Sequence, residues 1–309
     1  MVAGYRLTAS ERLFGVANHL FLTLFALATL YPFWFVLQGS FTDPGFPLRF
    51  LWPRGFYYAN YQQVFTVTGI WKAYVITIAR VGVAVPLTLM VTGGAAFALT
   101  RPEFVGRNAV ILLFFITMFI NGGLIPLYMV LRTVGLINNF LVYVIPVVFN
   151  VWMMIVMKTS FRSLPDGLVE AAVIDGANYL TIFFRIAIPL SLPMIATMGL
   201  FNAVWHWNDW TYGAFYVSAP DLRPLQTFLQ EAILEGGLSD HLAALWHHGG
   251  GAGRDDLRLD HNVLQQLHRL TPESLKFAFI VVTTVPILCV YPFIQRYFIK
   301  GVMIGSIKE

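Results

Sequence analysis

Apolar residues along this chain gather into long runs that short polar stretches separate. Six runs reach about 20 residues, the length that a helix needs to cross the hydrocarbon core of a bilayer. They lie at about 13–38, 70–99, 107–131, 135–157, 187–213 and 275–299. Each run is continuous, unlike the alternating strands of about 10 residues in an outer-membrane barrel. The pattern predicts an all-α integral membrane protein with six transmembrane helices in one domain over residues 1–309.

Composition agrees with a chain whose solvent is largely lipid. Hydrophobic residues make up 57% of the 309 residues and charged residues 12%, whereas about a quarter of a soluble domain is charged. The net charge of +4 does not indicate a nucleic-acid partner, because the basic residues gather at the ends of the apolar runs. Cys289 is the single cysteine, so the sequence offers no disulfide pair and no Cys-x-x-Cys motif.

The first apolar run has two interpretations. Arg6 and Arg12 precede it, and Ala26-Leu27-Ala28 matches the cleavage site of a secretory signal peptide. The run nevertheless continues through Leu37, well beyond the apolar region of a signal. We therefore expect a retained first transmembrane helix.

Lys and Arg near the ends of the runs predict orientation, because short cytoplasmic loops are enriched in both. With a cytoplasmic N-terminus, the inner segments hold ten such residues: Arg6, Arg12, Arg101, Arg107, Lys158, Arg162, Arg185, Arg296, Lys300 and Lys308. The short outer segments hold four: Arg49, Arg54, Lys72 and Arg132. The outer loop 214–274 is long enough to cross regardless of its charge. We expect a multi-pass protein of the bacterial inner membrane with both termini, and the loop 158–190, in the cytoplasm.

The cytoplasmic loop contains EAAVIDG at residues 170–176, within a short helical pattern. Ser163 is placed to cap this helix and Pro165 suits its first turn. Gly176 is placed to end it, because glycine adopts the left-handed conformation. A second helical run, 179–188, then leads to the fifth span. The pattern alone is compatible with an interfacial linker or with a docking helix for a cytoplasmic partner.

The same residues resemble the EAA loop of binding-protein-dependent ABC importer permeases, which reads E-A-A-x3-G-x9-I-x-L-P. Glu170, Ala171, Ala172 and Gly176 match, and Ile188 stands for the leucine. In that family the loop is a coupling helix that fits a groove on the ATP-binding subunit. The resemblance implies the type I importer fold, and it assigns ATPase contacts to Glu170, Ala171, Ala172, Asp175 and Gly176.

Two further stretches are similar to permeases that import complex oligosaccharides. They are TMFINGGLIPLYMVLRTVGLINN, residues 117–139, and VYPFIQRYFIKGVMIGSIKE, residues 290–309. Importers of alginate and other acidic polysaccharides fall within this subfamily. The resemblance implies a heterodimer with a second permease subunit, two cytoplasmic ATP-binding subunits and an external sugar-binding protein, besides the membrane lipids.

The chain itself is not expected to be an enzyme. It has no G-x-x-x-x-G-K-[ST] phosphate loop, so ATP and Mg²⁺ would be bound by the partner subunits, and we expect no cofactor here. An ion-coupled secondary transporter is the alternative; it requires intramembrane acids or paired repeats, and Asp209 is one candidate acid. An intramembrane enzyme would require a nucleophile beside a base, which the surroundings of His206 do not supply.

Polar and aromatic residues within the fifth run suggest a substrate path. Asn202, Trp205, His206 and Asp209 follow the i, i+3, i+4, i+7 spacing of one helix face. Aromatic rings stack on sugar faces, and amides and carboxylates bind hydroxyl groups. Asn208, with Trp207, is similar to the fifth span of the subfamily. The alternative is an aromatic belt at the outer membrane interface.

Arg80 is a basic residue inside the second run. Insertion of an arginine costs roughly 2.5–3.5 kcal/mol at the bilayer centre, so its charge requires a partner or water. Three interpretations remain open: a pair with Asp209, attraction of an anionic sugar, or snorkelling of the side chain to the outer interface.

The segment 238–262 differs from the rest of the chain in its polar composition. Its potential metal ligands are His241, His247, His248, His261, Asp240 and Asp260. Their spacing matches no known metal site, and Gly249 to Gly251 favour a flexible loop. We expect no metal here, and a contact with the sugar-binding protein is the functional hypothesis for this loop.

Overall fold

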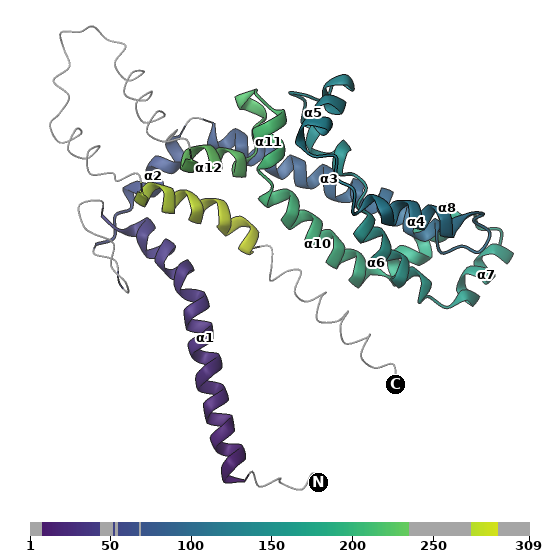
Figure 1. Ribbon diagram of the computed structural model, residues 1–309, viewed down its shortest axis with the longest axis horizontal. Helices are drawn as coiled ribbons and strands as arrows, with labels where there is room; N and C mark the ends of the chain where they lie inside the picture. Colours follow the sequence, from purple (N-terminus) through teal and green to yellow (C-terminus); the bar gives the residue numbers. More distant parts are fainter. Residues whose placement is uncertain (1–7, 44–51, 53–54, 68, 235–272, 290–309) are drawn as a thin grey trace. The chain divides into compact units, whose positions relative to one another are not determined.

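The structure is a computed structural model that describes residues 8–43, 52, 55–67, 69–234 and 273–289. Every regular element within these ranges is helical, as Figure 1 shows. The chain divides into two compact units, Met1–Val67 with Gly236–Val282, and Thr68–Glu235 with Thr283–Glu309. The helical class predicted from the sequence is therefore confirmed.

The first unit is built on α1 (Ala9–Phe41), which covers the first apolar run. Thr8 and Glu11 form a reciprocal capping box at its start. At its other end, the Asn60 amide of α2 (Ala59–Thr66) donates to the Ser40 carbonyl at 2.9 Å. Gly39 lies directly against the Phe277 ring, where a Cβ atom would be 2.5 Å from the ring. The absence of a side chain therefore permits close packing within this unit.

The second unit is organised around α3 (Ile70–Ala98), which matches the second predicted run. It packs against α6 (Val151–Arg162), α10 (Leu192–Asn208) and α12 (Leu225–Leu234), and Figure 1 shows α6 and α10 beside it. One core cluster joins α3, α6 and α10 to the loop 158–190 and includes Phe97, Met154, Met157, Phe161 and Ile182. A second cluster surrounds Tyr143, with Leu131 and Tyr216.

The third and fourth predicted runs are not continuous helices. The run 107–131 is divided into α4 (Arg107–Thr117) and α5 (Leu124–Thr133). Gly123 separates them with φ +81° and ψ −179°, a conformation that is essentially restricted to glycine. The run 135–157 begins with the 3₁₀ helices η1 (Phe140–Tyr143) and η2 (Ile145–Val147), and α6 then follows at a 52° bend.

The fifth predicted run is bent and broken. Residues 179–190 and α10 meet at an angle of 86° around Ser191. The helix then ends at Asn208, and α11 (Thr211–Tyr216) begins after a break. The run 275–299 is helical over residues 273–289, and its remainder lies outside the described residues.

By length and composition, α1 and α3 could each cross a membrane among the described residues. If each bent pair counts as one span, the number rises to four, while α4 and α5 are shorter apolar helices. The six-span arrangement, its boundaries and its orientation remain predictions.

Candidate functional site

The EAA segment forms a helix of its own, α7 (Asp166–Ile174), shortly after α6 ends. The predicted cap is wrong, because Ser163 belongs to the end of α6 and its hydroxyl donates to the Ser160 carbonyl at 2.8 Å. Pro165 is the N-cap residue of α7 and provides no side-chain hydrogen bond. Its fixed backbone conformation, rather than a serine hydroxyl, starts the helix.

Gly176 ends α7 as the sequence predicts. Its φ is +81°, its amide donates to the Val173 carbonyl at 3.0 Å, and the Ala177 amide donates to the Ala172 carbonyl at 2.9 Å. These two bonds are those of a Schellman motif, which satisfies the last carbonyls of a helix. The turn after α7 is therefore defined by the backbone, with Asp175 exposed at the C-cap position.

The two faces of α7 differ in their surroundings. Val169 is buried, and Ala172 is half-buried against the core that contains Met157 and Phe161. The opposite stripe is exposed and consists of Gly167, Glu170, Ala171 and Ile174. These positions follow the i, i+3, i+4, i+7 spacing of one helix face. Of the two alanines assigned to the ATPase contact, Ala171 is therefore on the free surface, whereas Ala172 packs against its own chain.

The exit from the loop is joined to the same core. Asn178 caps α8 (Tyr179–Ile182) through a 2.8 Å bond that its Oδ1 accepts from the Thr181 amide. A π-helical turn, η3 (Phe183–Ala187), and the short α9 (Ile188–Leu190) then lead to the bend before α10. Ile182 and Phe183 are buried in the core. Both ends of the α7 loop thus share one packed cluster with α3 and α6.

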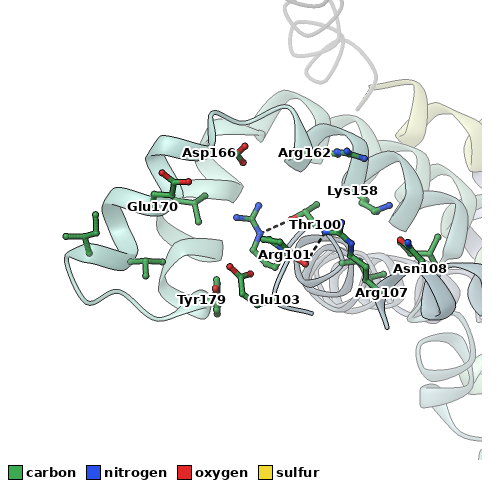
Figure 2. Close-up of a pocket in the computed structure, with 16 residues that line it drawn as sticks. Thr100, Arg101, Glu103, Arg107, Asn108, Lys158, Arg162, Asp166, Glu170 and Tyr179 are labelled. Atoms are coloured by element: carbon green, nitrogen blue, oxygen red, sulfur yellow. Dashed lines mark hydrogen bonds between the residues drawn. The ribbon is translucent and has the colours of Figure 1, made fainter. Parts of the chain in front are cut away.

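A cavity of about 740 Å³ lies beside α7. Figure 2 shows Asp166 and Glu170 on the α7 side of it, and Arg107, Asn108 and Lys158 away from that helix. Arg101 points into the cavity, where its Nε donates to the Thr100 hydroxyl at 3.0 Å and its guanidinium lies 4.8 Å from the centre of the Phe97 ring. From the sequence, these basic residues predict only the orientation of the chain. Their convergence around one cavity was missed, because they come from separate loops and helices.

The second group of candidate residues surrounds Arg80. Its side chain is fully buried, with 0% exposure, and its Nη2 lies 2.5 Å from Asp209 Oδ2. Its Nη1 donates to the Asp209 carbonyl at 3.0 Å and its Nε to His206 Nδ1 at 3.2 Å. The guanidinium also lies over the Tyr143 ring, 4.8 Å from its centre. Of the three interpretations, the pair with Asp209 is confirmed and snorkelling is wrong.

The predicted face of the fifth run is only partly preserved. Asn202 and His206 are buried, whereas Trp205 and Asn208 are exposed. Asp209 follows the end of α10 with an extended backbone, and its Oδ1 accepts a hydrogen bond from the Thr211 hydroxyl. Asp209 is therefore turned toward α3 by the helix break and does not continue the helix face.

A second cavity, of about 370 Å³, lies on the other side of Trp205. Trp205 and Asn202 line it from α10, together with Phe201, and Asn150 and Trp152 line it from the start of α6. The sequence pattern predicted Asn202 and Trp205 of α10 as candidate residues, but not Asn150 and Trp152. The 52° bend before α6 brings these two residues, at the start of the helix, to the cavity. The apolar pattern of the sequence does not predict this bend. The residues 238–262, with their histidines, lie outside the described residues.

Comparison with known proteins identifies the family to which the chain belongs. The profile of the family described as "Binding-protein-dependent transport system inner membrane component" matches residues 88–304. Protein LplC of Bacillus subtilis strain 168 is 34% identical over 97% of this chain and 97% of its own length. The polygalacturonan/rhamnogalacturonan transport system permease protein YtcP of the same organism is 32% identical over 96% of this chain and 99% of its own length.

A solved structure is similar along the whole chain. One chain of a bacterial ABC transporter involved in the import of the acidic polysaccharide alginate superimposes with a TM-score of 0.80 at 29% identity. The match covers 95% of this chain and 99% of the other. Members of this family are membrane permease subunits of ABC importers, and separate subunits carry the ATPase activity. The protein belongs to the inner membrane component family of binding-protein-dependent transport systems and has the fold of a type I ABC importer permease.

Proposed function

We propose that this chain is the permease subunit of an importer for an acidic oligo- or polysaccharide, and that it works by alternating access. Two relatives support the substrate class, because their names specify polygalacturonan/rhamnogalacturonan and alginate, whose sugar residues carry carboxylates. The proposed complex contains a second permease subunit, two cytoplasmic ATP-binding subunits and an external sugar-binding protein. Its location is the bacterial inner membrane, with both termini and α7 in the cytoplasm.

The observation that carries the mechanism is the two-sided environment of α7. Its inner face packs on the core through Val169 and Ala172, and its outer stripe leaves Glu170 and Ala171 free. A helix that packs on its own chain along one face and is exposed along the other can bind a partner and transmit the partner's movement to the core. The small side chain of Ala171 permits close approach, and Glu170 supplies one charge for orientation. Closure of the ATPase subunits on ATP would move α7, and with it the core of α3 and α6.

The cavity beside α7 is the second part of this proposed coupling surface. Its lining includes four basic side chains, those of Arg101, Arg107, Lys158 and Arg162, and three carboxylates, those of Glu103, Asp166 and Glu170. Among the described residues, no ion pair is formed between members of the two groups. Such charges remain available to polar groups of an ATPase subunit at this face.

The geometry does not favour ion-coupled transport. The candidate proton carrier, Asp209, is already bound by Arg80 through its carboxylate and its carbonyl. This acid is therefore already engaged by a buried partner and is not free to serve as the site of a coupling ion.

The proposal is tested by reconstituting the chain in liposomes with and without its neighbouring ATPase, second permease and binding protein. We expect uptake of a labelled oligogalacturonide or oligoalginate that requires ATP and all four components. Uptake by this chain alone, driven by a proton or sodium gradient, would overturn the proposal.

A further inference from the structure

A charged cavity and an apolar cavity adjoin each other at the C-terminal end of α3. The charged cavity is the one of about 740 Å³ beside α7, and the apolar cavity measures about 310 Å³. Arg101, Glu103 and Tyr179 line both cavities, which makes them neighbours. The other residues of the smaller cavity are all apolar: Gly94, Phe97, Ala98, Phe104, Leu180 and Phe183. A charged space thus continues into an apolar one.

The basic side chains of the charged cavity are partly removed from water and lack an acidic partner. Arg101, Arg107 and Lys158 are half-buried, and none of them forms an ion pair within the part of the chain that the structure describes. A cation that loses its hydration without gaining a partner is energetically unfavourable. The carboxylates of the same cavity are all exposed, so water solvates them. The half-buried cations therefore require an anion more than the carboxylates require a cation.

Arg101 is held at the junction of the two cavities. Its Nε donates to the Thr100 hydroxyl at 3.0 Å, and its guanidinium lies 4.8 Å from the centre of the Phe97 ring. Arg107 Nη1 donates to the Arg101 carbonyl at 3.5 Å, which keeps the second arginine beside the first. Figure 2 shows the Arg101 side chain in the cavity and Lys158 on the wall away from α7. Guanidinium groups arranged in this way suit the oxygens of a phosphate group.

The combination of the two cavities fits an amphipathic anion. Basic pockets between transmembrane helices on the cytoplasmic side bind anionic lipid head groups, and the apolar cavity provides a surface for an acyl chain. Tyr179 borders both, as expected for a tyrosine at the boundary between head groups and hydrocarbon. A free phosphate ion would use only the charged cavity, and a neutral apolar molecule only the other one.

From these observations we infer that the two cavities together form a binding site for one anionic glycerophospholipid of the cytoplasmic leaflet. The phosphate lies between Arg101, Arg107 and Lys158. One acyl chain lies in the apolar cavity against Leu180 and Phe183. The inference rests on the proposed function only for the cytoplasmic position of α7, and the carboxylates on the α7 side of the charged cavity remain available to the ATPase subunit.

The head-group contact is tested by lipid binding to the purified full-length chain in detergent. Native mass spectrometry measures the phosphatidylglycerol bound per chain over a series of lipid concentrations. Arg107→Gln and Lys158→Gln should each weaken this binding roughly fivefold, the contribution of one basic side chain at an anionic membrane surface. Arg132→Gln is the matched control, because Arg132 is an exposed arginine at the end of α5 and lines neither cavity. It should bind phosphatidylglycerol as the wild type does.

The acyl-chain contact is tested by filling the apolar cavity. Gly94 lines this cavity within α3, and the space at its Cβ position is open, so Gly94→Leu should fill the cavity and weaken binding. Gly82→Leu is the control, because Gly82 lies on the same helix with equally open space and lines neither cavity. Leu180→Asp places a charge on an exposed lining residue and should weaken binding too. It keeps the test decisive if Gly94→Leu does not fold.

The ligand class is tested by competition. Phosphatidylethanolamine with the same acyl chains should bind more weakly than phosphatidylglycerol, and inorganic phosphate should not displace the lipid. Equal binding of the two lipids would overturn the inference, since the basic wall would then select no net charge. Loss of binding in Lys158→Gln with normal binding in Gly94→Leu and Leu180→Asp would indicate an anion site without an acyl chain, and would also reject it.

The assembled complex separates this site from the ATPase contact. Phosphatidylglycerol should remain bound when the ATPase subunits are present. Its release on assembly would assign the basic residues to the subunit interface and reject the lipid site. Lipid binding is measured without transport, so a complex that binds phosphatidylglycerol as expected but imports no sugar would reject the proposed function and support the lipid site.

Discussion

The guanidinium of Arg80 and the carboxylate of Asp209 form a buried ion pair that joins the middle of α3 to the end of α10, with 2.5 Å between Nη2 and Oδ2. The same guanidinium binds the Asp209 carbonyl at 3.0 Å, and a cation at this position complements the negative end of a helix dipole. Arg80 is thus a clamp on the helix break, and its charge is not available to a passing sugar.

Removal of the Arg80 side chain should lower the stability of the folded chain. In Arg80→Met the carboxylate of Asp209 stays buried without its partner, which typically costs about 3–5 kcal/mol. We expect a large fall in the thermal unfolding temperature of the purified protein in detergent. In the double variant Arg80→Met/Asp209→Asn both charges are absent, so much of the stability should return.

An exposed ion pair of Lys72, which lies on the same helix as Arg80, provides the matched control. Lys72 and Asp221 are 2.7 Å apart, but both side chains are largely exposed, and such pairs contribute about 0–1 kcal/mol. Lys72→Met should therefore leave the unfolding temperature nearly unchanged. Equal shifts for Lys72→Met and Arg80→Met would show that burial of the Arg80 pair has no energetic consequence.

The turn at Gly176 should be sensitive to any side chain. A Cβ atom there would meet nothing within 4 Å, but the φ of +81° is unfavourable for residues other than glycine. Forcing such a residue into the left-handed conformation costs roughly 1–2 kcal/mol. We expect Gly176→Ala to reduce, and Gly176→Trp to abolish, the coupling of ATP hydrolysis to uptake in the reconstituted complex, while the chain is still inserted.

Gly82 is the control for Gly176 because it lies within α3, has no positive φ, and also has open space at its Cβ position. Alanine is favoured over glycine inside a helix by about 1 kcal/mol. Gly82→Ala should retain full coupling. If Gly176→Ala and Gly82→Ala couple equally well, the defined turn is not required for transmission.

The two alanines of the EAA segment should respond differently to enlargement. Ala171→Leu adds volume on the free stripe, so the chain should keep its unfolding temperature but lose co-purification with the ATPase subunits. Ala172→Leu adds volume against the core, and overpacking typically costs about 1–3 kcal/mol. It should lower the unfolding temperature. The reverse assignment of the two effects would reject the proposed orientation of α7.

Asn138 should contribute to stability through its side-chain hydrogen bonds and through its left-handed backbone conformation. It has a φ of +56°, its Oδ1 accepts from the Ser218 and Ala219 amides, and its own amide donates to the Tyr216 carbonyl at 3.0 Å. Asn138→Gly removes the side-chain bonds alone, at about 1 kcal/mol. Asn138→Ala adds backbone strain and should unfold at a lower temperature. An alanine variant as stable as the glycine variant would contradict this reasoning.

Much of the local structure was predictable from the sequence. The helices α1 and α3 follow uninterrupted apolar runs, and the end of α7 follows from the position of Gly176. The EAA spacing predicted the family, which the comparisons confirm. These features are local, because length, periodicity and glycine content act within a few residues of the position that they describe.

The choice of partners was decided only by the tertiary structure. The sequence could not show that Arg80 pairs with Asp209 instead of reaching the interface, because the two residues are 129 positions apart. It could not show that Ala172 faces inward while Ala171 is free, or that Trp152 and Trp205 border one cavity. Apolar periodicity indicates whether a side chain is removed from water. It does not distinguish a side chain that faces lipid from one in the protein core or one that lines a binding cavity. Only the packing of distant helices determines which of these three environments a side chain meets.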